Sequence, residues 1–166
     1  EGTYPLPEAQ VDRFMLKVLV EYPTHEEERE ILNRMAKTSS NTDVDCVMHA
    51  ESIAHARKLV DQIYVDDNIA DYIVNIVQTT RTPEQVSDDF AVFVENGASP
   101  RATLALTLCA KANAFLEGRG YVIPQDVKDL AHDVLRHRIT TSYEAEAEGV
   151  TADNIISSIL NYVKVP

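Results

Sequence analysis

The stretch Gly97-Ala98-Ser99-Pro100-Arg101 marks the start of a helix in this chain of 166 residues. Serine is favoured just before a helix because its hydroxyl accepts a hydrogen bond from an otherwise unpaired backbone N–H, and proline suits the first helical position. Gly118 is a typical helix end. The apolar residues between these signals recur at helical spacing. They are Ala105, Leu108, Ala112, Phe115 and Leu116.

Arg101 falls in the first turn of this helix, where the positive end of the helix dipole disfavours a cation. An anion such as a phosphate group at the same helix end would offset that cost. The alternative is an ion pair with a nearby carboxylate, such as Glu95 or Asp89. The local pattern by itself favours the ion pair.

Helical patterns also occupy most of the chain on either side of this stretch. Thr24 and Glu27 form a capping box that begins a helix, whose apolar stripe is Ile31, Leu32 and Met35. Further helices are predicted over residues 49–63, 67–80, 124–135 and 151–163, with a short one at 82–85.

Phe14 to Val20 differs from these patterns, because it is apolar on both faces apart from Lys17. Such a run is typical of a strand that is covered on both sides in a parallel sheet. A lone strand cannot satisfy its own backbone groups, and no comparable strand follows it. We therefore expect its sheet to lie upstream of Glu1; pairing with a second copy of the chain is the alternative.

Residues 37–45 are polar and rich in Ser, Thr, Asn and Asp, so they are predicted to be a linker. The expected fold is mainly α. Residues 41–166 would form a helical domain, and residues 1–40 would be the terminal strand and helix of a truncated α/β domain.

Composition narrows the possible functions. The net charge of −12 argues against nucleic-acid binding, which needs a basic face. The 2 cysteines are too few for a disulfide framework and suit a reducing cytoplasm. No run is long and apolar enough to cross a membrane, and no signal peptide is visible. The apolar fraction of 45% can fill a core, and the start at Glu1 hints at a fragment.

The sequence contains no complete active site. The pairs His49/His55 and His132/His137 are not spaced as metal ligands on one helix face, so we predict no metal site. Both cysteines are predicted to be buried hydrophobic residues. The acidic run Glu144–Glu148 is predicted to be a solvated turn. A phosphate-binding P-loop motif, G-x-x-x-x-G-K-[ST], does not occur.

Arg13 lies between a predicted helix at residues 8–12 and the apolar run. An arginine at a strand edge is usually a surface residue or an ion-pair partner, here of Asp12. The residues alone favour that interpretation.

Four stretches that include these arginines resemble the MoxR family of AAA+ ATPases. The segment from Gly2 to Phe14 resembles the part of the family that follows sensor 1, and G-A-S-P-R-A at residues 97–102 resembles its sensor 2 segment. G-R-G-Y-V-I-P-Q-D-V at residues 118–127 and V-L-R-H-R-I at residues 134–139 match two further stretches. The matches keep the family's order and span nearly the whole chain.

The resemblance implies that the chain is the C-terminal part of such an ATPase, with the whole helical lid. It assigns Arg13 as the arginine finger, which reaches the ATP of a neighbouring subunit, and Arg101 as sensor 2, which contacts the phosphates in its own subunit. With the resemblance, these roles are favoured over ion pairs. Walker A, Walker B, sensor 1 and the Mg²⁺ ligands would lie upstream, so the fragment alone should not hydrolyse ATP.

In the family such proteins form rings, here expected to be hexameric and cytoplasmic, and remodel or mature protein clients, often von Willebrand factor A-domain proteins. One departure is Ile123, which stands where the family usually has a capping threonine; Asp126 could substitute in part. Two alternatives stay open: a non-catalytic helical interaction module derived from a lid, and a motor of the magnesium-chelatase type. The segment from Gly2 to Arg13 favours MoxR over the latter.

Overall fold

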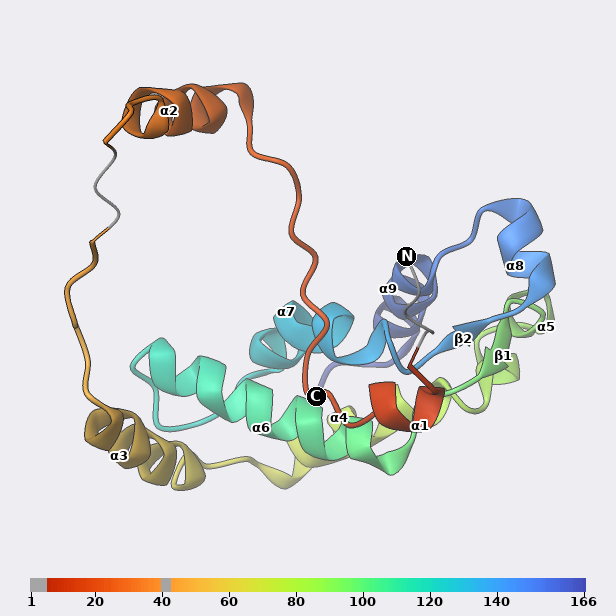
Figure 1. Ribbon diagram of the computed structural model, residues 1–166. Helices are drawn as coiled ribbons and strands as arrows, with labels where there is room; N and C mark the ends of the chain where they lie inside the picture. The colour runs from red at the N-terminus through yellow and green to blue at the C-terminus, as the bar shows by residue number, and fades with distance from the viewer. Residues whose placement is uncertain (1–5, 40–42) are drawn as a thin grey trace.

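The computed structural model describes residues 6–39 and 43–166, most of which are helical, as the predicted fold class requires (Figure 1). The elements are α1 (Glu8–Val11), α2 (His25–Met35), α3 (Ala50–Asp61), α4 (Asp67–Thr79), the 3-10 helix η1 (Pro83–Gln85), α5 (Asp88–Ala91), β1 (Val94–Asn96), α6 (Pro100–Leu116), α7 (Pro124–Leu135), β2 (Thr140–Thr141), α8 (Tyr143–Glu148) and α9 (Ala152–Tyr162). Strands β1 and β2 form a small antiparallel pair, with Val94 opposite Thr141.

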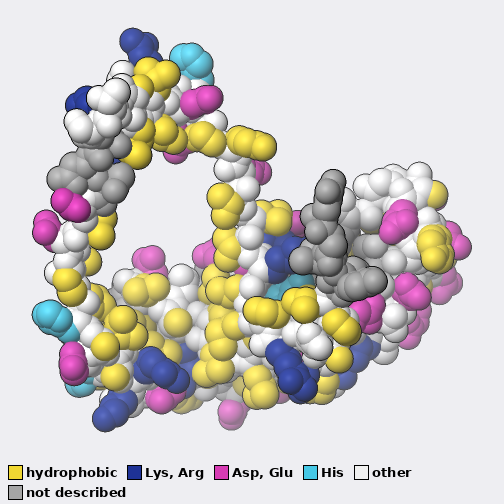
Figure 2. All heavy atoms as spheres, in the orientation of Figure 1, with side chains coloured by type: hydrophobic (Ala, Val, Ile, Leu, Met, Phe, Trp, Pro, Cys, Tyr) yellow, Lys and Arg dark blue, Asp and Glu magenta, His cyan; other side chains and the backbone are white. Residues whose placement is uncertain are grey.

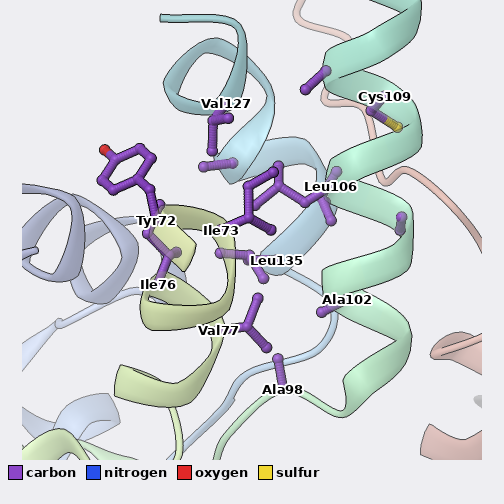
Figure 3. Close-up of a cluster of buried hydrophobic side chains, with 14 of the residues drawn as sticks. Tyr72, Ile73, Ile76, Val77, Ala98, Ala102, Leu106, Cys109, Val127 and Leu135 are labelled. Atoms are coloured by element: carbon purple, nitrogen blue, oxygen red, sulfur yellow. The ribbon is translucent and has the colours of Figure 1, made fainter. Parts of the chain in front are cut away.

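The core lies where α6 packs against α4 and α7, with α9 closing the side formed by α7 and α4 (Figures 1 and 3). Ile73 of α4, Leu106 of α6 and Leu135 of α7 meet there and are fully buried. Each such side chain contributes about 1.5–3 kcal/mol relative to an exposed one. This helical body positions the start of α6 and the end of α7.

The face that α6 buries differs from the predicted one. Of the apolar residues that recur at helical spacing, Ala105 is buried but Leu108 and Leu116 are exposed. The buried face is made mostly of small side chains, namely Ala102, Ala105, Leu106, Cys109, Ala110 and Ala114. Small residues let neighbouring helices approach closely, and α6 is apolar on most sides, so periodicity could not select the buried face.

The predicted strand at residues 14–20 is wrong for this structure: residues 14 and 15 form a bend, residues 16–20 form no helix or strand, and the side chains of the segment are exposed. A strand needs backbone partners on a neighbouring strand, and no described segment supplies a ladder for it. Hydrophobic side chains therefore lie open to solvent along the chain that leads from α1 to α2 (Figure 2).

Helix α2 stands apart from the helical body (Figure 1). Its predicted capping box is present, since Thr24 N–H donates to Glu27 Oε2 at 2.8 Å and Glu27 N–H donates to the Thr24 hydroxyl at 3.3 Å. The predicted stripe of Ile31, Leu32 and Met35 is exposed, however, so its burial is not observed. Local capping is enough to set the helix start, but only a tertiary partner could bury its apolar face.

Two smaller features complete the fold. The acidic run at residues 144–148 belongs to helix α8 and is not a turn; the Ser142 hydroxyl accepts from Ala145 N–H at 3.2 Å, and the helix ends at Gly149 with φ 71°. Part of the predicted linker, residues 40–42, lies outside the described residues, as do residues 1–5 of the segment that resembles the family. Within the described ranges, no helix has the length and apolar character that a membrane span requires.

Candidate functional site

The start of α6 is held in place by a close backbone contact with the end of α4. Gly97 lies against this backbone, and a Cβ on Gly97 would stand only 2.2 Å from Thr80 O. Ala98 N–H donates to the buried Thr80 hydroxyl at 2.9 Å. The Ser99 hydroxyl accepts from Arg101 N–H at 3.2 Å, which confirms the predicted helix start.

Arg101 projects from this first turn with its side chain 54% exposed. Its Nη1 lies 3.3 Å from Asp12 Oδ2, so its carboxylate partner is Asp12 and neither Glu95 nor Asp89. Asp12 directly follows α1 and lies 89 positions away in sequence, which local pattern analysis could not detect. The same Asp12 oxygen accepts from the Ser99 hydroxyl at 2.9 Å.

Asp12 is the shared acceptor of this site. Its other oxygen, Oδ1, lies 3.1 Å from Arg138 Nε. Partial burial acts to raise the pKa of Asp12, but the hydrogen bonds from Ser99, Arg101 and Arg138 outweigh it and lower the pKa below its usual value. Asp12 is therefore a stable carboxylate between two arginines near neutral pH.

Arg138 is almost completely buried, with 2% of its side chain exposed. Besides Asp12 Oδ1, it donates to three backbone carbonyls of the turn and bend that follow α1: Asp12 O at 3.1 Å, Phe14 O at 2.6 Å and Met15 O at 3.2 Å. It also donates to Val134 O at the end of α7. A buried guanidinium needs such hydrogen-bond acceptors, and most of those used here belong to residues next to Arg13 in the sequence.

Two further side chains after α7 bind the same segment. His137 Nε2 lies 2.9 Å from Phe14 O and Arg136 Nη1 donates to Lys17 O at 2.7 Å. Lys17 N–H in turn donates to Asp133 O at 2.8 Å. Burial lowers the pKa of His137, and a carbonyl can only accept, so His137 donates from Nε2 as a neutral ring.

Arg13 lies in the middle of this bound segment, yet its own side chain is exposed. Among the described residues its guanidinium makes no hydrogen bond or ion pair. Of the two interpretations that the residues alone favoured, Arg13 is a surface residue, and its ion pair with Asp12 does not form because Asp12 faces Arg101 and Arg138 instead. The structure thus joins Arg101 to Arg138 through one carboxylate, that of Asp12, which precedes Arg13 in the sequence.

Asp12 and Arg138 are the residues that sequence reasoning missed as parts of a site. Asp12 entered only as a neighbour of Arg13, and Arg138 only as a letter in the V-L-R-H-R-I stretch. The available signal was the run of basic side chains at residues 136–138. Such a run is equally typical of a solvent-exposed turn. Only the contact with residues 12–17, more than 100 positions away, distinguishes the two interpretations.

The predicted substitute cap of α7 is confirmed. The carboxylate of Asp126 accepts from Ile123 N–H at 2.8 Å and pairs with both terminal nitrogens of Arg119, at 2.8 and 2.5 Å. Asn113 of α6 donates to the same group at 2.9 Å. This arrangement is structural, since it joins α6 to α7 away from residues 12–17.

The other candidates carry little chemistry. Cys109 is buried, as predicted, and burial raises its pKa, but Cys46 is exposed, contrary to prediction. His132 pairs with Asp153 at 3.1 Å. Across residues 6–39 and 43–166 no cluster of three or more His, Cys, Asp or Glu side chains is arranged to hold a metal ion.

Comparison with known proteins shows what this chain is similar to. Residues 90–159 match the family model of the AAA lid domain. The whole chain is 41% identical to Chaperone MoxR1 of Mycobacterium tuberculosis and 40% identical to the uncharacterized protein YeaC of Bacillus subtilis, and covers 44% and 49% of those proteins. The chain thus spans about half the length of the curated relatives it matches.

A solved structure agrees with these sequences. The crystal structure of a proposed ATPase from Cytophaga hutchinsonii superposes on the whole chain with a TM-score of 0.93 and 40% identity, and the match covers 51% of that protein. Its similarity extends over the N-terminal residues as well as the lid. The chain is thus similar, over its whole length, to about half of a MoxR-type protein, and its residues 90–159 match the AAA lid domain.

Proposed function

We propose that this chain is the lid-containing C-terminal part of a MoxR-type ATPase, in which Arg101 contacts the phosphates of ATP in its own subunit. Arg13 would act in trans on the ATP of the neighbouring subunit. The observation that carries the proposal is the placement of Arg101: an accessible guanidinium at the start of a helix that the AAA lid model includes, with a single carboxylate as its partner.

The two arginines suit phosphoryl transfer, which depends on electrostatic stabilisation of the charge on the transferred group. Arg101 stands at a helix start, where backbone dipoles also favour an anion. Its ion pair with Asp12 is a half-exposed one, which a phosphate can displace at small cost. Arg13 is exposed and unpaired within the described residues, as a group that serves another subunit must be.

The proposal divides the chain into residues 1–40, the end of the nucleotide-binding core, and residues 41–166, the lid. The apolar and exposed segment 14–20 supports it, because such a segment suits a strand of a sheet that other residues complete. The P-loop, Walker B, sensor 1 and the Mg²⁺ ligands would belong to that sheet. The 166-residue chain alone would then contain no complete ATP-binding site.

For the whole protein we propose a ring, of six subunits, that couples ATP hydrolysis to the remodelling or maturation of protein clients in the cytoplasm. The name of the Mycobacterium tuberculosis relative, a chaperone, supports client remodelling. Clients with von Willebrand factor A domains are the first class to test. The net charge of −12 supports protein clients over nucleic acid.

Mixed rings test the proposal in the complete protein that carries this chain. Rings of Arg13→Ala or of Arg101→Ala should each lose ATP turnover, by roughly 10³-fold or more for the finger. In a 1:1 mixture, some ATP sites are held by an Arg13→Ala subunit next to an Arg101→Ala neighbour. Such a site has both arginines, because the first subunit supplies Arg101 and the neighbour supplies Arg13. About one site in four should therefore recover activity in a ring of random order.

No recovery in the mixture would contradict the assignment of Arg13 to the neighbouring site. The isolated 166-residue chain is the control and should show no turnover. Turnover by that chain which disappears in Arg101→Ala would instead show that the active site is complete without upstream residues.

A non-catalytic interaction module is the second candidate, and the exposed apolar side chains of α2 and residues 14–20 favour it. It predicts assembly that does not depend on nucleotide. Equal oligomeric states with and without ATP, in a complete protein that lacks turnover, would support it over the ATPase.

A further inference from the structure

The turn that follows α7 binds residues 12–17 mostly through hydrogen bonds from its own side chains to the backbone carbonyls of that segment. Arg136, His137 and Arg138, which we call the 136–138 turn, donate to the carbonyls of Asp12, Phe14, Met15 and Lys17. Lys17 N–H returns one hydrogen bond to α7, at Asp133 O. The segment on both sides of Arg13 is therefore fixed to the lid, although it forms no helix or strand with it.

These contacts leave the Arg13 side chain free while they fix its backbone. The carbonyls of Asp12 and Phe14, the two residues that flank Arg13, both accept from Arg138 Nη2, at 3.1 and 2.6 Å. A side chain that has to reach a neighbouring subunit gains most when its backbone is already fixed, since less conformational freedom is lost in the productive state.

Asp12 connects this arrangement to Arg101. One carboxylate oxygen pairs with Arg138 and the other with Arg101 and Ser99. A phosphate that attracts Arg101 would remove one of the two cations from Asp12, and the remaining one is the residue that fixes the backbone at Arg13. The site that binds ATP in one subunit is thereby linked to the group offered to the next subunit.

We infer that Arg138 is a positioning residue for Arg13: the 136–138 turn holds segment 12–17 on the lid, so that lid movement carries Arg13 with it. The inference rests on the proposed function, because it requires Arg13 to act on a neighbouring subunit. Arg138 itself is buried and would touch neither ATP nor the transferred phosphoryl group.

The first test measures the contact in the 166-residue chain by hydrogen exchange at the Lys17 amide. Arg138→Lys keeps the charge but cannot reach the several acceptors that a guanidinium bridges. We expect exchange at Lys17 to accelerate about tenfold or more. Arg136→Lys, which weakens the contact with Lys17 O together with the ion pairs of Arg136 with Asp133 and Asp153, is the second variant should Arg138→Lys fold poorly.

Arg119→Lys is the matched control, because Arg119 makes a comparable ion pair with Asp126 away from residues 12–17. It should destabilise the lid without a selective change at Lys17. Equal acceleration in both variants, or none in Arg138→Lys and Arg136→Lys, would overturn the inference.

The second test asks which subunit needs Arg138, and uses mixed rings of the complete protein. If Arg138 positions Arg13, Arg138→Lys subunits should recover turnover when mixed with Arg101→Ala subunits and should not recover it with Arg13→Ala subunits. A purely structural loss would recover with neither, and an effect on Arg101 would recover only with Arg13→Ala.

Recovery with neither partner, or recovery only with Arg13→Ala, would overturn the inference and leave the ATPase proposal intact. A wild-type complete protein without turnover would overturn the proposed function, and with it any role of Arg138 in placing an arginine finger. Recovery between Arg13→Ala and Arg101→Ala, together with the expected Arg138→Lys pattern, supports both.

Discussion

Single charged side chains join the N-terminal part of this chain to its helical body. Asp12 lies between α1 and the extended segment, while Arg101 and Arg138 belong to the helical body. Side chains of opposite charge that are partly shielded from water interact more strongly than exposed pairs. The Arg138 pair, with 2% and 18% exposed side chains, should therefore contribute more stability than the Arg101 pair.

Asp12→Asn should destabilise the folded chain by about 1.5–3 kcal/mol at pH 7, because hydrogen bonds to a charged group are lost. The folded pKa of Asp12 lies below the ordinary value of 3.8. The carboxylate therefore stabilises the fold fully above that value, and the effect disappears as the pH falls through the folded pKa. Urea unfolding of both proteins at pH 7 and at pH 2–3 should show the difference shrinking in acid; a constant difference would contradict this account.

Gly97→Ala should destabilise the chain by about 1–3 kcal/mol, because the new Cβ would overlap backbone atoms of the α4 end that cannot move aside easily. Gly120→Ala is the matched control, since a Cβ there meets nothing within 4 Å and no positive φ is required. Thermal unfolding checks the pair. Similar losses for both variants would show that backbone flexibility, and not the contact with Thr80, explains the effect.

Among the secondary-structure elements, helix formation and helix burial have separate causes. Capping sets the start of α2, α6 and α9 from residues within one turn, and these starts were predictable. Burial depends on which other element is available. Helix α4 buries its apolar face because α6, α7 and α9 pack against it, whereas α2 stands apart from the helical body (Figure 1).

The triple substitution Ile31→Lys, Leu32→Glu and Met35→Lys on α2 should change the unfolding free energy of the 166-residue chain by less than about 0.5 kcal/mol, since these side chains are exposed. Ile73→Ala in α4 should cost about 2–5 kcal/mol, because Ile73 is completely buried. Urea unfolding compares them. A large loss from the α2 variant would mean that its apolar stripe is covered in solution.

At the scale of the whole molecule, the helical body encloses the buried core, whereas the described N-terminal residues are mostly exposed. Residues 14–20 hold the composition of a buried strand but lie extended on the surface, fixed only at the end nearest the 136–138 turn. Their backbone groups beyond Lys17 have no ladder within the described residues. The proposed nucleotide-binding sheet would supply that ladder and would cover the same apolar side chains.

The sequence by itself determined the starts of α2, α6 and α9, the mainly α class and the resemblance to the MoxR family, because caps, helical spacing and long matched stretches are local properties of the chain. It also identified Arg13 and Arg101 as candidates. The tertiary structure alone decided that Asp12 and not Glu95 or Asp89 pairs with Arg101, that small residues form the buried face of α6, and that Arg138 binds the backbone around Arg13. Such contacts join residues about 90–125 positions apart, and no local pattern encodes which distant partner a charged or apolar side chain will meet.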